Sequence, residues 1–86
     1  MKVIFAEYAW EDYLYWHKTD KAVVKRIHLL IKDIQRDPFS GLGKPEVLRF
    51  QLSGYHSRRI STEHRMVYRI AEGDLLIAAL RYHYED

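Results

Sequence analysis

The first forty residues carry one short extended pattern followed by two helical patterns. Lys2–Phe5 is rich in β-branched and aromatic residues, which is typical of a strand. Over residues 7–18, apolar side chains recur every three or four positions, which predicts an amphipathic helix. A second helix is predicted to begin after Thr19 or Asp20, either of which can cap it. It should end at Asp37-Pro38, because proline disfavours helical backbone in the residue before it.

The second half of the chain has a different period. Residues 37–47 contain both prolines and two of the four glycines, which is typical of a loop. From residue 47 onward, apolar and polar positions alternate with a period of two, and short turn sequences interrupt the alternation. This pattern predicts four further strands, at Val47–Gln51, His56–Thr62, Arg65–Ala71 and Leu75–Tyr82.

The order of these elements predicts an α+β domain. We expect an antiparallel sheet with both helices packed on one face, in the order β-α-α-β-β-β-β, as a single domain over residues 1–86. A chain of 86 residues buries only a modest share of its surface, which excludes a deep enclosed cavity for a dinucleotide cofactor.

The lengths of the turns decide which side chains share a face of the sheet. A two-residue turn after Thr62 would mix apolar and cationic side chains on both faces, and burying an unpaired arginine is costly. A three-residue turn over residues 62–64 avoids this, and it would pair Arg59 with Val67. With a second such turn over residues 72–74, even-numbered residues lie beneath the helices. The opposite face then carries Arg59, Arg65, Arg69, Leu75, Ile77, Ala79, Arg81 and His83.

Charge is unevenly distributed along the chain. The formal net charge is only +2, but residues 41–84 carry seven Lys/Arg against four Asp/Glu, and six of those seven are arginine. Guanidinium groups match phosphate oxygens, and 14% of all residues are aromatic. Basic residues interleaved with aromatic ones suggest a nucleic-acid partner, but a net charge of +2 does not by itself define one. There is no cysteine and no apolar run near 18 residues. We therefore expect a cytoplasmic protein without disulfides, thiolate metal sites or a membrane span.

Three kinds of group are sufficient to cleave RNA without a metal or cofactor: a base, an acid and cations that stabilise the phosphorane. Glu46 is a candidate base, or else a solvated loop carboxylate, and His83 is a candidate acid, or else a surface histidine. Arg59 and Arg65 are candidate phosphate ligands, or else surface cations paired with nearby acids. Tyr84 is a candidate platform for a base, or else an aromatic edge group.

Several motifs distributed along the whole chain carry a more specific signal. They include Gly43-Lys44-Pro45-Glu46, Ser57-Arg58-Arg59-Ile60, Glu63-His64-Arg65 and the terminal Arg81-Tyr82-His83-Tyr84. In these motifs the chain resembles the YoeB (Txe) family of bacterial toxins, within the RelE-like superfamily. The resemblance implies a RelE-like fold and a ribosome-dependent endoribonuclease that cuts mRNA in the A site of the small ribosomal subunit. It also implies inhibition by a cognate YefM-type antitoxin, and no metal or cofactor.

The resemblance also implies a role for each matching residue. Glu46 resembles the general base on the 2′-hydroxyl, and His83 resembles the general acid for the leaving oxygen. Arg65 is similar to the arginine that stabilises the phosphorane, Arg59 to a supporting phosphate contact, and Tyr84 to the residue that orients or stacks on the substrate. Further RNA- or phosphate-binding residues implied by position are Lys44, Arg49 and Arg81.

The chain departs from the family pattern at two places. Arg49 stands where the family commonly has lysine, and Glu85-Asp86 extend past the usual end. Two alternatives remain open: a ParE-like inhibitor that acts without catalysis, and an RNA- or ribosome-binding module of the same fold. The family tends to dimerise, and the aromatic residues of the first helix exceed what so small a core needs, so we expect a homodimer. These aromatic residues are Trp10, Tyr13 and Trp16.

Overall fold

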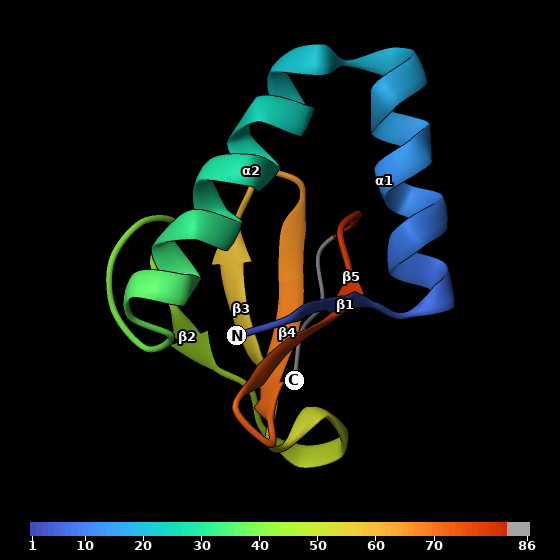
Figure 1. The fold of residues 1–86 in the computed structure, drawn as a ribbon. Coiled ribbons are helices and arrows are strands. Elements are labelled where there is room, and N and C mark those ends of the chain that lie inside the picture. The colour runs from blue at the N-terminus through green and yellow to red at the C-terminus, as the bar shows by residue number, and fades with distance from the viewer. Residues whose placement is uncertain (83–86) are drawn as a thin grey trace.

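A computed structural model describes residues 1–82, in which two helices pack against one face of a five-stranded sheet (Figure 1). The helices form a hairpin that follows the first strand, and the remaining strands follow the helices, as the sequence pattern predicts. The elements are β1 (Val3–Phe5), α1 (Glu7–Thr19), α2 (Lys21–Arg36), β2 (Glu46–Val47), a 3₁₀ helix (Phe50–Leu52), β3 (His56–Arg59), β4 (Arg65–Ala71) and β5 (Asp74–Ala79).

The boundary between the two helices is the capped turn that the sequence predicts. The carboxylate of Asp20 accepts hydrogen bonds from the backbone N–H groups of Ala22 and Val23, at 3.0 and 3.3 Å. These bonds satisfy two of the donors that the first turn of α2 leaves without an intrahelical partner. The helix then buries its apolar stripe against the sheet, and the stripe comprises Val24, Ile27, Leu30 and Ile34.

The sheet has the order β1-β5-β4-β3-β2 and is mixed. All neighbours are antiparallel except β1 and β5, which run parallel, with Ile4 opposite Leu76. The expectation of a wholly antiparallel sheet is therefore wrong for this pair. The two strands are separated by almost the whole chain, so no hairpin turn dictates their relative direction.

The pairing of β3 with β4 differs from the predicted register. Arg59 lies opposite Arg65, and His56 opposite Tyr68, so the connection is a five-residue loop over residues 60–64. Nη1 of Arg65 donates to the carbonyls of three loop residues, at 2.8, 3.1 and 3.2 Å, and so stabilises the longer loop. The register is shifted by two residues, so side-chain parity is preserved. Arg59 and Arg65 share one face, as predicted.

The pairing of β4 with β5 differs by one residue, and this changes the face of each side chain. Glu72 and Gly73 have φ of 53° and 80°, which is typical of a two-residue hairpin turn, and Ala71 pairs with Asp74. As a result Leu75 and Ile77 lie beneath the helices, where the sequence pattern predicted Leu76 and Ala78.

A β-bulge then restores the predicted alternation at the end of β5. Tyr68 pairs with Ile77, whereas the neighbouring Val67 pairs with Ala79, so Ala78 is the additional residue on β5. Beyond the bulge, Ala79 packs with Val67 on the face opposite the helices, and Leu80 returns to the core beneath them.

The predicted strand over residues 47–51 is shorter than expected. β2 ends at Val47, and the chain reverses through the 3₁₀ helix, closed by hydrogen bonds from Leu52 N–H to the Arg49 carbonyl and from Ser53 N–H to the Phe50 carbonyl. Phe50 has φ of 53°, which is incompatible with a continued strand.

Candidate functional site

The sheet face opposite the helices brings three of the predicted site residues together. Glu46 lies opposite Ser57, which lies opposite Val67, so these side chains form one row across the sheet. Residues directly opposite one another in antiparallel strands share a face. Arg59 and Arg65 form the next row on this face, about 7 Å further along the strands. The register therefore places a carboxylate and two guanidinium groups on one surface.

Small and apolar side chains continue the row that begins at Glu46. Ser57, Val67 and Ala79 are each buried, and the last two form a small cluster with Leu48. This second cluster is distinct from the main core under the helices. The charged side chains lie beside this buried cluster: Glu46 is on the edge strand β2, Arg59 is the last residue of β3 and Arg65 is the first residue of β4.

Arg65 is buried and held in one orientation. Its side chain is 8% exposed, and Nη1 makes all three of the hydrogen bonds to loop carbonyls, of Ser61, Thr62 and His64. A buried charge requires such partners, because an unpaired one is costly. These bonds use one of the three guanidinium nitrogens, and they also fix where the loop over residues 60–64 lies.

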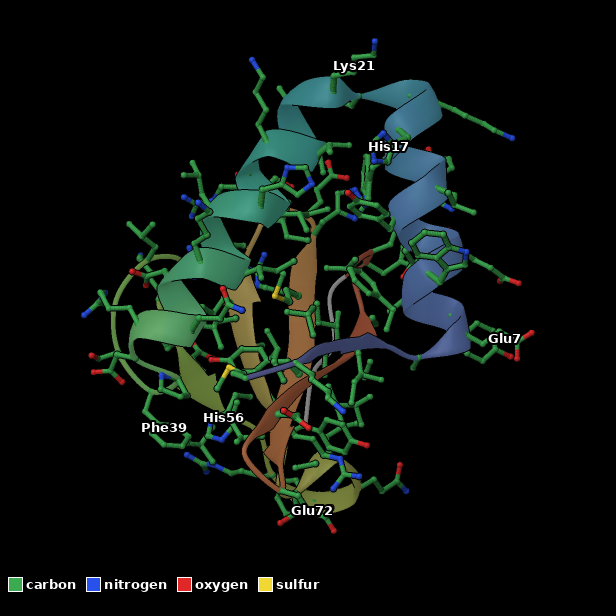
Figure 2. The ribbon with its side chains drawn as sticks, in the orientation of Figure 1. Glu7, His17, Lys21, Phe39, His56 and Glu72 are labelled. Carbon is green, nitrogen blue, oxygen red and sulfur yellow. The ribbon has the colours of Figure 1, made fainter. Side chains whose placement is uncertain are left out.

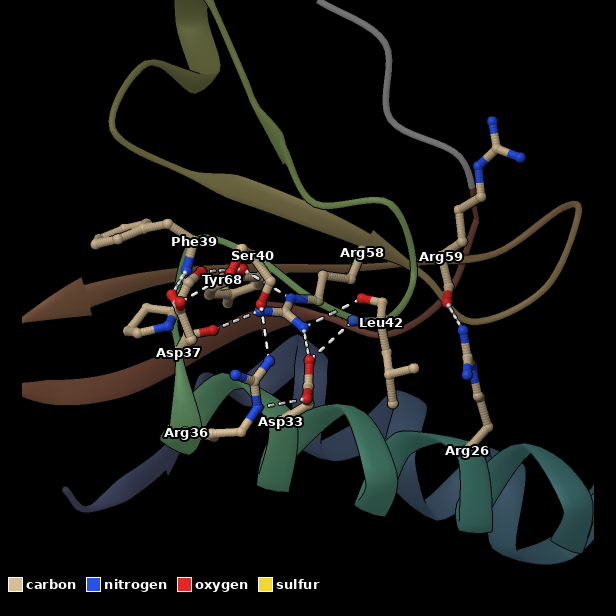
Figure 3. A network of polar contacts seen from close by, with 11 residues as sticks. Arg26, Asp33, Arg36, Asp37, Phe39, Ser40, Leu42, Arg58, Arg59 and Tyr68 are labelled. Carbon is tan, nitrogen blue, oxygen red and sulfur yellow. Dashed lines mark hydrogen bonds and ion pairs between the residues drawn. The ribbon is translucent and has the colours of Figure 1, made fainter.

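Arg59 is exposed and is held through its backbone. Its N–H donates to the carbonyl of Gly43 at 2.7 Å, and its carbonyl accepts from Nη2 of Arg26 at 3.2 Å. Figure 3 shows the Arg59 side chain directed away from α2, while the Arg26 guanidinium meets the carbonyl from the helix side. The bond to Gly43 also ties β3 to the loop that carries Lys44 and leads into Glu46.

Arg58 is the residue of this region that sequence reasoning missed. It is fully buried, and all five of its N–H groups face acceptors (Figure 3). Nε donates to the Tyr68 hydroxyl at 3.1 Å, and Nη1 forms an ion pair with Asp33. Its position on the helix face was available from its even number, but its partners were not. The remaining acceptors are the carbonyls of Asp37, Ser40 and Leu42.

Asp33 joins α2 to the loop over residues 37–45. The hydrogen bond from Leu42 N–H, followed by those from Arg58 and Arg36, lowers the pKa of Asp33 from 3.8 to about 2. Gly41 allows the loop to pass this close to Asp33, because Gly41 has φ of 125° and a Cβ there would overlap the Asp33 carboxylate. The loop before Glu46 is therefore anchored by a buried polar network.

Three aromatic rings, of Phe39, His56 and Tyr68, pack beside this network. The His56 ring lies between Phe39 and Tyr68, with ring centroids 5.1 and 5.6 Å away, and Figure 2 shows His56 beside Phe39. Burial, and to a lesser extent the nearby Arg58 charge, lowers the pKa of His56. The ring packs as an aromatic side chain against Phe39 and Tyr68.

The other predicted site residues have different outcomes. Lys44 and Arg49 are exposed on either side of β2. Arg81 was expected on the face opposite the helices, and this is wrong, because its guanidinium carbon lies 3.6 Å from the ring centroid of Tyr15 on α1. The strand ends at Ala79 and the chain bends over residues 80–82, so strict alternation no longer applies there. His83 and Tyr84 lie outside the described residues.

Two further features of the chain concern metal ions and membranes. Within residues 1–82, no group of three His, Asp or Glu side chains could hold a metal ion. Neither α1 nor α2 is long and apolar enough to cross a membrane.

Several solved structures that share this fold are bacterial toxins. The YoeB/ParE toxin from Agrobacterium tumefaciens superposes with a TM-score of 0.95 and 44% identity, covering 98% of this chain and 100% of that one. A YoeB dimer from Staphylococcus aureus gives 0.91 and 45%, with 98% of both chains covered. The RelBE2 toxin-antitoxin complex of Mycobacterium tuberculosis gives 0.70 and 25%, covering 95% of this chain and 96% of that one. The architecture is the RelE-like toxin fold.

Sequence comparison defines the family. Residues 5–84 match the model of the YoeB-like toxin of bacterial type II toxin-antitoxin systems. Toxin YoeB of Escherichia coli strain K12 is 60% identical over 84 residues, which is 98% of this chain and 100% of that protein. Toxin YoeB of Streptomyces coelicolor is 52% identical over the same length and the same shares of both chains. The protein is therefore a toxin of a type II toxin-antitoxin system, and it belongs to the YoeB family.

Proposed function

We propose that this toxin is a ribosome-dependent endoribonuclease that cleaves mRNA in the A site of the small ribosomal subunit, which inhibits translation. Membership of the YoeB family supports the assignment of this chain to a type II toxin-antitoxin system. The observation that carries the chemistry is the strand register, which puts Glu46 on the same sheet face as Arg59 and Arg65. An open sheet face can receive RNA that another body, the ribosome, holds in place.

In the proposed mechanism, the Glu46 carboxylate removes the proton from the 2′-hydroxyl of the cleaved nucleotide. The 2′-oxygen attacks phosphorus, and Arg65 and Arg59 stabilise the charge on the phosphorane. The bond from phosphorus to the 5′-oxygen then breaks, and His83 donates a proton to that oxygen. The products are a 2′,3′-cyclic phosphate, which water can open to a 3′-phosphate, and a 5′-hydroxyl. In this scheme Tyr84 orients or stacks on the substrate.

The outer cations have a supporting role in this scheme. Lys44 and Arg49 flank β2 on either side of Glu46, where exposed charges attract the phosphate backbone. Arg81, which packs on Tyr15, would act on RNA only from the end of the sheet next to α1. The charges nearest the scissile phosphate are therefore assigned to Arg59 and Arg65.

The proposed partners follow from the relatives. A YoeB-YefM complex from Staphylococcus aureus is heterotetrameric, and a YoeB dimer from the same species is known. We propose a YefM-type antitoxin with an acidic segment that folds over the basic face, and a homodimer. Trp10 is 48% exposed and available for an interface, whereas Trp16 belongs to the core. Action on ribosomes implies a cytoplasmic location.

The decisive experiment maps cleavage on purified ribosomes that hold a known codon in the A site. The wild-type toxin should cut within that codon, and Glu46→Ala should lower the cleavage rate by about 10²–10⁴-fold. His83→Ala should do the same. Arg59→Ala tests phosphate binding without disturbing the loop that Arg65 holds. Glu11→Ala, a change of an exposed acid on α1, is the matched control and should leave cleavage unchanged.

Two outcomes would overturn the proposal. Undiminished cleavage by both Glu46→Ala and His83→Ala would refute the assigned chemistry. Binding to ribosomes without cleavage of the A-site codon would identify a binding module instead, and inhibition of DNA gyrase supercoiling without mRNA cleavage would identify a ParE-like inhibitor.

A further inference from the structure

The last described residues are held by α1 through the backbone of Leu80. Its N–H donates to Oδ2 of Asp12 at 3.0 Å, and its carbonyl accepts from Nε1 of Trp16 at 2.8 Å. Leu80 and Trp16 are both buried. Both the N–H and the carbonyl of Leu80 therefore have a hydrogen-bond partner on α1, although β5 has already ended at Ala79.

Two residues later, Tyr82 has an unusual backbone conformation. Its φ is 70°, in the left-handed region that side chains other than glycine rarely adopt. The Tyr82 side chain is 57% exposed, so burial of the ring does not account for this conformation. The backbone hydrogen bonds do: the N–H donates to Nδ1 of His64 at 2.8 Å, and the carbonyl accepts from Arg65 N–H at 2.9 Å. A strained conformation persists where its surroundings determine it in this way.

The hydrogen bond also defines the state of the His64 ring. A backbone N–H can only donate, so Nδ1 must carry a lone pair and the ring must be the neutral tautomer with its proton on Nε2. The ring packs edge-on against Trp16, with centroids 4.8 Å apart. The backbone of His64 is itself fixed, since its N–H donates to Oγ of Ser61 and its carbonyl accepts from Ile60 N–H. These contacts fix the position of Nδ1, the atom that accepts the hydrogen bond from Tyr82 N–H.

We propose that His64 is a positioning residue for the cleavage reaction. Its Nδ1 holds Tyr82 in the left-handed conformation, and Tyr82 is bonded directly to His83, the next residue in the sequence. The inference rests on the proposed function, in which His83 is the general acid. Arg65 contributes at the same point, because its side chain stabilises the loop that carries His64 while its own N–H binds the Tyr82 carbonyl.

Two substitutions separate the hydrogen bond from the packing of the ring. His64→Phe keeps a flat ring against Trp16 and removes the acceptor. His64→Asn gives up the ring and keeps an acceptor, Oδ1, at the position of Nδ1. A positioned general acid contributes about 10²–10⁴-fold, so we expect His64→Phe to lower the single-turnover cleavage rate on saturating programmed ribosomes by about 10–100-fold. Affinity for the ribosome should change less than about twofold, and His64→Asn should recover most of the rate.

The controls make each result decisive. His17→Phe, an exposed histidine change on α1, should cleave at the wild-type rate. Urea titration of both His64 variants establishes that each is folded at the assay temperature. In a His83→Ala background, His64→Phe should cause no further loss, because the group that it positions is absent.

The failure of this inference is distinguishable from failure of the proposed function. If His83→Ala abolishes cleavage while folded His64→Phe cleaves at the wild-type rate, the positioning role is refuted and the function stands. Equal loss in folded His64→Phe and His64→Asn would also refute it, as would a loss that appears only in ribosome affinity. If His83→Ala cleaves normally, the assignment of the general acid fails, and the inference fails with it.

Discussion

Removal of a single oxygen atom, in Tyr68→Phe, is expected to destabilise the fold strongly. Tyr68 is fully buried at the boundary between the core and the network around Arg58. Its hydroxyl accepts from Nε of Arg58 at 3.1 Å and donates to the carbonyl of Pro38 at 2.7 Å. Burial raises the pKa of Tyr68, so the phenol keeps the proton that it donates. The phenylalanine ring fills the same space, which limits the effect to the two hydrogen bonds.

The expected loss of unfolding free energy follows from the two hydrogen bonds that Tyr68→Phe removes. A hydrogen bond to a charged group contributes about 1.5–3 kcal/mol and a neutral one about 1 kcal/mol, so the loss should be about 2.5–4 kcal/mol. A domain of this size has an unfolding free energy near the low end of about 5–15 kcal/mol. Each kcal/mol shifts the melting temperature by about 4–8 °C, so Tyr68→Phe should lower it by at least about 10 °C.

Urea titration, followed by tryptophan fluorescence, measures this loss. The dependence of free energy on urea should stay unchanged, since the same surface is exposed on unfolding. Tyr8→Phe is the matched control, because Tyr8 is 78% exposed, and its effect should lie within about 0.5 kcal/mol. A loss for Tyr68→Phe below about 1 kcal/mol would mean that water or a rearranged Arg58 replaces the hydroxyl, and would refute the reasoning.

Three further predictions concern the same loop and the helix hairpin. The lowered pKa of Asp33, about 2, means that its contribution to stability is complete above pH 3.8 and is lost as the pH falls toward 2. Urea midpoints from pH 5 to 2 should fall less steeply for Asp33→Asn, and parallel profiles would contradict this. Gly41→Ala should destabilise more than Gly54→Ala when both are compared by thermal melting, because both glycines have positive φ but only Gly41 faces the Asp33 carboxylate. Equal losses would contradict that contrast. Asp20→Ala removes the α2 cap and should cost about 0.5–2 kcal/mol in urea titration. A loss indistinguishable from zero would show that the cap contributes nothing.

The helices could be predicted because their signals are local. The apolar stripe of α2, the cap at Asp20 and the stop at Pro38 all lie within one continuous segment. Each depends on neighbours fewer than about five residues away, which the chain order already specifies. The same holds for the alternation that predicts the strands, and the family motifs of the site are likewise read residue by residue.

The registers of the strands could not be predicted in this way. The loop before Arg65 is longer than predicted because the Arg65 guanidinium binds its carbonyls, and the turn at Glu72-Gly73 is shorter. A change of one residue moves every side chain of a strand to the other face, and the bulge at Ala78 moves them back. Side-chain parity was therefore predicted correctly for Arg59 and Arg65 and wrongly for Leu75 and Ile77.

By itself, the sequence determined the helix hairpin, the succession of helices and strands along the chain and the family motifs, because these depend on residue types and on spacings along the chain. Only the tertiary structure decided where the charges lie. Arg58 and Arg59 are neighbours in sequence, yet one is fully buried with Asp33, which is 25 residues away, and the other faces solvent. A strand directs successive side chains to opposite faces, and burial of a charge is tolerated only where folding brings acceptors to it.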